Sequence, residues 1–376
     1  MHPIQKDLFS RTSGSDFVKL SLGSKCAILN AFWPHLQLDQ SEIVEDEYAV
    51  FFDFIGKTLQ SLYRHAHRFA AQDLDSLLSD VSDMRTNRDM TRGALTLEIQ
   101  KRYLNTLETD VARSMELAAR LWLGLNVCSR HLSIGPRNGR DSLVDWPDTQ
   151  SLDEMIAAQF KRRGQVSPDN TSLDDSFTAA NLKNICRLRI RWTDNLVDHL
   201  KLEGPRGQRS LTIYRHKLSL INHRKGPDPT MIPADILDEA LRTLDLLFPF
   251  GDPNTDAFLD EEGIQFRIVA FAELPRATET DDFYYWRKNL VALSSLLNGP
   301  PETIAQTLLD TRNLAQFATL WVAIFGVFLL TILFGILSTV YSVKQYRVAV
   351  KSYELSLVLA CQQSSAALPQ FCFSRR

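Results

Sequence analysis

The sequence is poor in cysteine, and its cysteines are scattered. Five occur in 376 residues, none of them in a C-x-x-C pair: Cys26, Cys128, Cys186, Cys361 and Cys372. A disulfide framework or a zinc site needs cysteines grouped at short, regular spacings. The pattern argues against both and favours a reducing compartment.

An excess of charge of one sign is also missing. The 42 Lys and Arg residues oppose 45 Asp and Glu, a formal net charge of -3. We therefore expect no nucleic-acid partner. One stretch is locally basic, with Arg187, Arg189, Arg191, Arg206, Arg209, Arg215, Lys217, Arg224 and Lys225. Because Asp194, Asp198 and Asp228 lie among these cations, an exposed strand face and loop is favoured over a site for anionic lipid or phosphate.

Catalytic motifs are absent as well. The chain has no G-x-S-x-G, no phosphate-binding glycine loop, no G-x-G-x-x-G and no H-E-x-x-H. Asp252, Asn254 and Asp256 have the spacing that opens a calcium loop. Ala257 and Gly263 stand where that loop needs its glycine and its glutamate. A solvated acidic loop is the favoured interpretation.

His65 and His67 are two residues apart in a segment with helical periodicity. Side chains at that spacing point away from each other on a helix, so surface histidines are favoured over metal ligands. No catalytic residue, cofactor or metal ligand is therefore predicted, and an enzyme is the less favoured class of protein.

What the chain does have is one long stretch without charge. Residues 317–340 read FATLWVAIFGVFLLTILFGILSTV, and the charge-free run extends from Arg312 to Lys344. A helix needs roughly 20 apolar residues to cross a bilayer, so this stretch predicts a single transmembrane span with the lipid bilayer as its partner. The residues chosen to mark the span are Phe317, Trp321, Phe325, Gly326, Gly335 and Val340.

Small and aromatic residues of this stretch carry further indications. Trp321 lies near one end, and Tyr341 and Tyr346 near the other, where amphipathic rings favour the headgroup level. Gly335 and Thr339 form one small-xxx-small pair, a weak signal for self-association with another helix.

The orientation of the span rests on two opposing observations. The first 17 residues lack the continuous apolar core of a signal peptide, which favours a cytosolic N-terminal body. Lys344, Arg347 and Lys351 crowd the C-terminal flank, which by the positive-inside bias favours a cytosolic C-terminal side. We expect the cytosolic body, with one sequon at Asn170 treated as a chance match.

Periodicity predicts a fold that is mostly α with a small α+β portion. Four parts are expected: a helical region over 1–164, a small α+β unit over 176–298, a long helix over 301–343 containing the span 317–340, and a tail over 344–376. The boundary between the first two is placed in the polar stretch 164–175.

Within this frame, apolar residues at three- and four-residue steps predict helices over about 45–82 and 95–128. Ser151 and Glu154 form a capping box that starts a helix to about residue 163. Further helices are expected over 233–248 and 281–298, the latter ended by a left-handed Gly299. A helix begun by Pro301 is expected to continue into the span.

Alternating polar and apolar residues predict strands over 187–192 and 211–214. With the turn at 204–207 between them, they suggest a hairpin. A third strand is expected over 264–271.

Several segments together carry a resemblance: residues 191–200 (RWTDNLVDHL), 211–214 (LTIY), 246–249 (LLFP) and the LWVAIF that opens the span. Over about residues 95–350 the chain resembles a group of uncharacterised proteins of filamentous fungi that have a soluble body and one C-terminal membrane helix. The resemblance implies an accessory role, with secondary metabolism as the pathway to consider. It brings no catalytic residues.

A looser likeness is to CorA-type magnesium channels, which join an α/β body to a long helix and a membrane domain. The chain lacks their Gly-Met-Asn signature and their second membrane helix. Three functional hypotheses follow. The favoured one is a membrane-tethered accessory or interaction protein; the alternatives are an oligomeric transport subunit and a membrane-surface enzyme using residues such as Asp194, Asp198 and His199.

Overall fold

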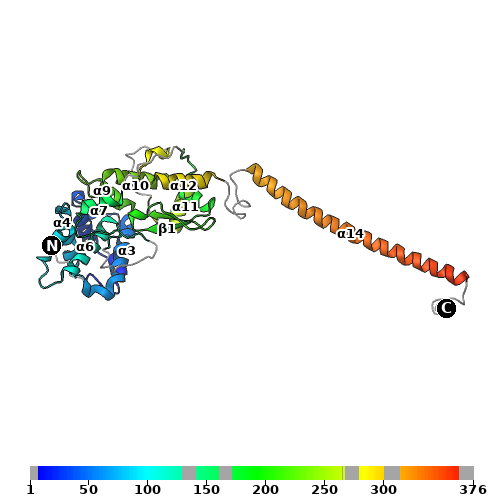
Figure 1. Ribbon diagram of the computed structural model, residues 1–376, viewed down its shortest axis with the longest axis horizontal. Coiled ribbons are helices and arrows are strands. Elements are labelled where there is room, and N and C mark those ends of the chain that lie inside the picture. The colour runs from blue at the N-terminus through cyan, green and yellow to red at the C-terminus, as the bar shows by residue number, and fades with distance from the viewer. Residues whose placement is uncertain are drawn as a thin grey trace. The chain divides into compact units, whose positions relative to one another are not determined.

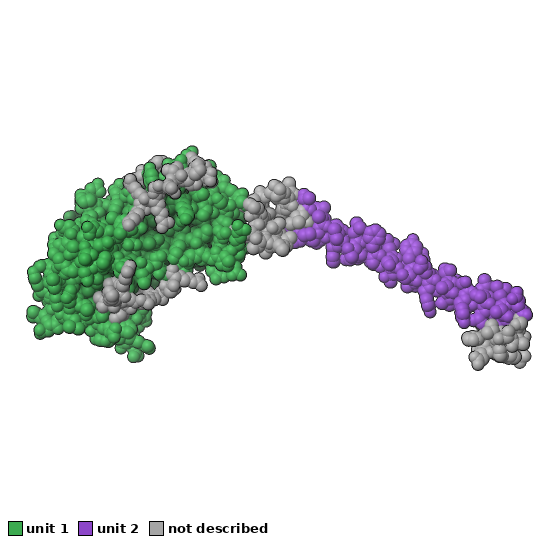
Figure 2. Space-filling view, in the orientation of Figure 1, with its two compact units in different colours: residues 1–303 green, residues 304–376 purple. Residues whose placement is uncertain are grey.

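The computed structural model describes residues 7–128, 141–160, 172–264, 266, 279–299 and 314–363. The chain divides into two compact units, residues 1–303 and 304–376, which Figure 2 shows in two colours. The fold is mostly α-helical with a small three-stranded mixed sheet and one long C-terminal helix (Figure 1), which confirms the predicted fold class. Both predicted parts of the body, 1–164 and 176–298, fall within the first unit.

The N-terminal part of the body is helical. Its helices are α1 (Ser13–Val18), α2 (Leu22–Phe32), α3 (Glu45–Leu62), α4 (Leu74–Thr86), α5 (Arg92–Gln100), α6 (Glu108–Leu123) and α7 (Leu152–Gln159). The predicted capping box at the start of α7 is confirmed, because Ser151 Oγ accepts from Glu154 N and the Glu154 carboxylate accepts from Ser151 N. These reciprocal bonds satisfy two amides that a helix start leaves open.

The prediction of one helix over 45–82 is wrong in its continuity. The α-helix ends at Leu62, a 3-10 segment (η3) covers Tyr63–Arg68, and α4 begins after Asp73. Asp73 caps α4 by accepting from Ser76 N at 2.8 Å. A capping aspartate marks a helix start, and here it fixes the break between α3 and α4.

The prediction of one helix over 95–128 is also wrong. A turn separates α5 from α6, and in it Asn105 has φ +59, a left-handed conformation that interrupts a helix. Leu104 and Leu107, expected on the apolar face, are 86% and 69% exposed. The cause is tertiary, because Arg102 and Tyr103 turn back to the buried carboxylate of Asp80 in α4.

The sheet comprises β1 (Arg189–Thr193), β2 (Leu202–Glu203) and β3 (Ser210–Tyr214), in the order β1-β3-β2. The strands predicted at 187–192 and 211–214 both exist, but they are parallel, so the predicted hairpin between them is wrong. The turn at 204–207 instead joins β2 to β3, which are antiparallel. The intervening chain crosses through the short 3-10 segment η4 (Leu196–Asp198), whose residues Leu196 and Asp198 are buried.

The remaining helices of the body are α8 (Ala179–Asn184), α9 (Lys217–Arg224), α10 (Ala234–Leu247), α11 (Pro253–Glu262) and α12 (Arg287–Asn298). The helix predicted over 233–248 is confirmed as α10. The one predicted to start at Asp281 begins at Arg287, after a 3-10 turn (η5, Thr280–Asp282). Gly299 has φ -79 and is extended rather than left-handed. Most of the predicted strand 264–271 lies outside the described residues.

Contacts across the body join its N-terminal helices to α9. The ring of His223 in α9 lies 5.4 Å from that of Trp33 and bonds the Trp122 carbonyl at 3.0 Å. The neighbouring Asn222 donates to Tyr48 Oη, and its carbonyl lies 2.8 Å from His35 Nε2. One core therefore includes residues from both predicted parts of the body.

The second unit contains α14 (Leu314–Gln363), labelled in the orange-to-red part of Figure 1. Its 50 residues correspond to a helix about 75 Å long at 1.5 Å per residue. The expected start at Pro301 lies outside the described residues. At the other end the helix continues past residue 343 to Gln363, so much of the segment assigned to a tail is helical.

Candidate functional site

Within the described part of the chain, α14 is the one helix long and apolar enough to cross a membrane. Its most apolar window is 0% buried within the protein. A core helix of a soluble protein would be covered, whereas side chains such as Val322, Phe328 and Leu333 are exposed. The helix is therefore suited to a bilayer, a non-aqueous environment that covers all of its faces.

The marked residues of the span all lie on α14. Phe317 falls in its first turn, and Trp321 stacks on Phe325 with 5.5 Å between ring centroids. A Cβ added at Gly326 or Gly335 would meet nothing within 4 Å, so both glycines present open surface to a neighbour. Val340, at the C-terminal end of the span, is exposed.

Polar groups inside the span are satisfied locally. The hydroxyls of Thr331 and Thr339 donate to the carbonyls of Val327 and Gly335, each at 2.8 Å. Hydroxyls bonded to the preceding helical turn cost little free energy in lipid. The described span thus brings no ionised group into the hydrocarbon.

Four of the nine cations in the basic neighbourhood of the body lie beside acids, among them Arg215 at Asp194. Arg191 lies within 4 Å of Asp141 and Glu203, Lys217 pairs with Asp245 at 2.5 Å, and Arg224 pairs with Asp238 at 2.6 Å. Pairing of this kind leaves little field to attract phosphate or anionic lipid. The arrangement favours the structural interpretation made from the sequence.

Asp194, Asp198 and His199 belong to separate clusters. Asp194 Oδ1 accepts from Arg215 Nε at 2.5 Å and lies 2.6 Å from His216 Nε2. Burial alone would raise the pKa of Asp194, but the hydrogen bonds and charges of His216 and Arg215 outweigh burial and lower that pKa to about 2. The carboxylate is thus held ionised as a structural partner.

Asp198 is fully buried and holds the crossover between β1 and β2. Its carboxylate accepts from Ser142 N at 2.8 Å, from Ser142 Oγ at 2.7 Å and from Asn195 Nδ2 at 2.7 Å. Lys201 Nζ lies 3.4 Å away. Since these donors use the carboxylate oxygens, the group is a structural tie rather than a free general base.

His199 faces the core. Its Nε2 lies 2.7 Å from Thr243 Oγ1, and its Nδ1 accepts from Tyr214 N at 3.2 Å. Burial lowers its pKa to about 3, so the ring is neutral at physiological pH. Both nitrogens are engaged, and none of the three suggested residues is directed at a common reacting position.

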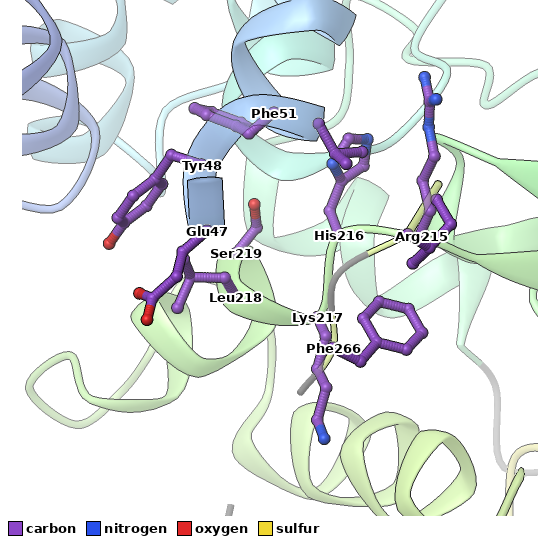
Figure 3. Close-up of a pocket in the computed structure, with 11 residues that line it drawn as sticks. Glu47, Tyr48, Phe51, Arg215, His216, Lys217, Leu218, Ser219 and Phe266 are labelled. Atoms are coloured by element: carbon purple, nitrogen blue, oxygen red, sulfur yellow. The ribbon is translucent and has the colours of Figure 1, made fainter. Parts of the chain in front are cut away.

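Figure 3 shows a cavity between α3 and the start of α9. Glu47, Tyr48 and Phe51 of α3 line one side, and the segment Arg215–Ser219 lines the other. Its volume of about 20 Å³ is room for about one water molecule, far below the ~300 Å³ that small-molecule sites begin at. The cavity is a packing gap beside the Asp194–His216 pair.

The positions with partial metal-site patterns have other roles. The acidic loop expected at 252–256 is wrong, because Asp252 caps α11 by accepting from Thr255 N at 3.0 Å and Asn254 and Asp256 lie inside the helix. His65 and His67 lie on the exposed 3-10 segment η3. Over the described ranges, no group of three or more His, Cys, Asp or Glu side chains is placed to hold a metal ion.

Cysteines differ between the two units. Cys26, Cys128 and Cys186 of the body are thiols, whereas Cys361, near the end of α14, is disulfide-bonded. The scattered spacing of the cysteines gave no sign of this bond.

Comparison with protein families, with curated proteins and with solved structures finds no match to this chain. The resemblance to fungal proteins therefore stays a prediction.

Proposed function

We propose that the chain is a single-pass membrane protein whose body is held at the cytosolic face and acts through contacts with other proteins. The observation that carries this proposal is α14, an uncovered apolar helix attached to a body with a core of its own. A bilayer supplies the cover that the helix lacks. The tether raises the local concentration of the body near membrane partners.

A cytosolic body is supported by the state of the cysteines. The cysteines of the body are thiols, which suits a reducing compartment, and the disulfide at Cys361 suits an oxidising one on the opposite side. Lys344, Arg347 and Lys351 oppose this orientation by the positive-inside bias. We give more weight to the thiols, since three basic residues are a small bias against the translocation of a large folded body.

A binding role is favoured over catalysis by the body's polar clusters. The carboxylates of half-buried Asp194 and buried Asp198 are engaged by structural donors, and the cavity beside His216 has room for only about one water molecule. The secondary-metabolite role, the transport subunit and the membrane-surface enzyme each stay predictions. In the described portion α14 alone qualifies as a span, whereas the CorA-type channels have a second membrane helix.

The test is protease protection on isolated membranes, with an epitope tag at each end of the chain. We expect the protein to stay in the pellet after carbonate washing, the N-terminal tag to be digested, and the C-terminal tag to be protected until detergent is added. Release by carbonate would contradict the membrane span. A protected body with a digested tail would contradict the cytosolic placement.

A further inference from the structure

The part of α14 beyond the charge-free run has an unusual construction. From Lys344 to Gln363 the helix continues for about 30 Å outside a bilayer centred on residues 321–343. This segment contains neither glycine nor proline. Kinks arise chiefly at those residues, so the helix leaves the membrane as a straight rod instead of folding onto its surface.

Apolar residues of this rod follow a heptad. Val343, Tyr346, Val350 and Tyr353 are spaced by three, four and three residues and are 47%, 71%, 37% and 60% exposed. Leu357 continues the series. Residues at these steps form one stripe along a helix, and an exposed stripe of this length in water calls for a partner helix.

A competing row on the same helix is interrupted. Tyr341, Val348 and Leu355 are exposed as well, but Gln345 and Ser352 occupy the intervening positions. In the first row every core position from Val343 to Leu357 is apolar. That row is the continuous seam, and we refer to Val343, Tyr346, Val350, Tyr353 and Leu357 as the seam.

Charged side chains lie beside the seam and not on it. Lys344 and Lys351 each follow a seam residue at the outward b position, and Arg347 and Glu354 take the e position. The g positions opposite them in a parallel pair are Ser342 and Ala349, which are neutral. Two copies would therefore pack without like charges facing across the interface, and two of the three a positions, Val343 and Val350, carry the β-branched residue that two-stranded coiled coils use there.

We propose that two copies of this chain pair in parallel through the seam, forming a short coiled coil that continues from the membrane span. The inference rests on the proposed membrane anchoring, because the bilayer fixes the depth and direction of every copy. Two identical helices thus meet already parallel and in register. The heptad also extends inward through Thr339, Ile336, Ile332 and Leu329, so span and rod share one face.

The seam also answers a problem of helix stability. About 20 residues of isolated, solvent-exposed helix are only marginally stable, since most helical stability in proteins comes from packing an apolar face. A second copy supplies that packing along the rod. A second copy of the chain is the favoured partner for the seam, because the membrane holds two identical spans at the same depth and so fixes the register of their rods.

The experiment is oxidative cross-linking of the full-length chain in membranes, with Val350→Cys on the seam and Val348→Cys as the matched control. Val348 and Val350 lie two residues apart in the chain, and both side chains are exposed. A disulfide requires Cα atoms within about 7 Å, a distance met at an a position of a parallel pair and not at the outward f position. We expect at least a fivefold excess of disulfide-linked dimer for Val350→Cys over Val348→Cys and over the unsubstituted chain.

Each outcome decides the question. Carbonate washing of the same membranes reports anchoring separately, so release of the chain would overturn the proposed function itself. A retained chain with equal cross-linking at both positions, with none, or with an excess at Val348→Cys would overturn the seam. Light scattering in mild detergent should give a protein mass twice 42.8 kDa, and a pentamer would also overturn the pair.

Discussion

At the scale of single residues, Gly124 shows how one position joins two parts of the body. It ends α6 with φ +62, and its carbonyl accepts from Leu196 N at 2.9 Å at the start of the crossover. A Cβ built on it would lie 2.2 Å from Tyr214 Oη, in β3. The residue therefore needs both the left-handed backbone and the missing side chain of glycine.

Gly124→Ala is expected to destabilise the body more than Gly263→Ala. Both glycines end a helix in the left-handed region, but a Cβ at Gly263 would meet nothing within 4 Å. Gly263→Ala should cost about 1–2 kcal/mol for the backbone conformation alone. Gly124→Ala should cost about 2 kcal/mol more, because buried Tyr214 must move. Urea unfolding followed by tryptophan fluorescence gives both free energies, and equal losses would contradict the close approach.

Asp80 is a second residue with a large individual effect. It is completely buried in α4, accepts from Tyr103 Oη at 2.9 Å and pairs with Arg102 at 2.8 Å. Burial raises its pKa to about 7, despite the opposing hydrogen bonds and the Arg102 charge. At pH 4–7 the native carboxyl thus keeps a proton that the unfolded chain releases.

The sign of the pH dependence follows from this difference. Stability from Asp80 is fully present below about pH 4 and is lost as the pH rises towards 7, a change of about 4 kcal/mol. In Asp80→Asn the group no longer titrates, so the variant should gain by about that amount relative to the wild type between pH 4 and pH 8. Urea unfolding at several pH values measures it. The exposed Asp75→Asn in the same helix is the control, expected to keep the wild-type profile.

At the scale of elements, Glu239 fixes the start of α12 against α10. Its carboxylate accepts three consecutive backbone amides, from Tyr284 and Tyr285 at 2.8 Å and from Trp286 at 2.7 Å. The ring of Trp286 then lies 5.2 Å from that of His199. A single buried side chain thereby sets where α12 begins, six residues later than the acidic pair 281–282 suggested.

Glu239→Gln should weaken the contact between α10 and the start of α12. The amide replaces one acceptor oxygen by a donor, leaving a buried N–H without a partner at a cost of about 2–3 kcal/mol. We expect faster hydrogen exchange at the amides of residues 284–286, together with a lower free energy of unfolding. Glu261→Gln, whose side chain is 69% exposed, should change stability by less than about 0.5 kcal/mol. Unchanged exchange at 284–286 would argue against the three-amide cradle.

Elements fixed by nearby residues could be predicted, and those fixed by distant ones could not. The capping box at Ser151 and the apolar face of α10 are local, and both helices were expected where they occur. The break between α5 and α6 depends on Asp80, about 20 residues earlier in the chain. The parallel pairing of β1 and β3 needs a crossover, and Asp198 in that crossover is bonded to Ser142, 56 residues earlier in the chain. Periodicity contains no information on such partners.

In the candidate site, too, features that depend on nearby residues could be predicted and features that depend on distant ones could not. The span could be recognised because length and absence of charge are properties of a continuous stretch. The engagement of Asp194 by His216 and Arg215 required the fold, since alternating residues say little about which cations a carboxylate will meet. The disulfide at Cys361 also gave no signal in spacing.

At the scale of the whole molecule, the apolar character of α14 should decide where the protein resides. The double substitution Leu330→Arg with Leu333→Arg puts two charges near the middle of the span, each costing about 2.5–3.5 kcal/mol on insertion. We expect loss of the carbonate-resistant fraction. Val348→Arg with Leu355→Arg places the same charges on exposed positions beyond the span and should leave that fraction intact. Equal behaviour of the two pairs in membrane flotation would contradict the assigned span.

The bonds between α9 and the N-terminal helices impose an order on biosynthesis. The Trp122 carbonyl bonds to His223, which is synthesised 101 residues later, and Tyr48 Oη bonds to Asn222. A ribosome adds about 5–20 residues per second, so the surfaces of Trp33, Tyr48 and Trp122 that α9 covers stay open for roughly 5–20 s after Trp122 is made. During that interval the nascent chain presents Trp33 and its aromatic neighbours to chaperones, and the body closes only when α9 has left the ribosome.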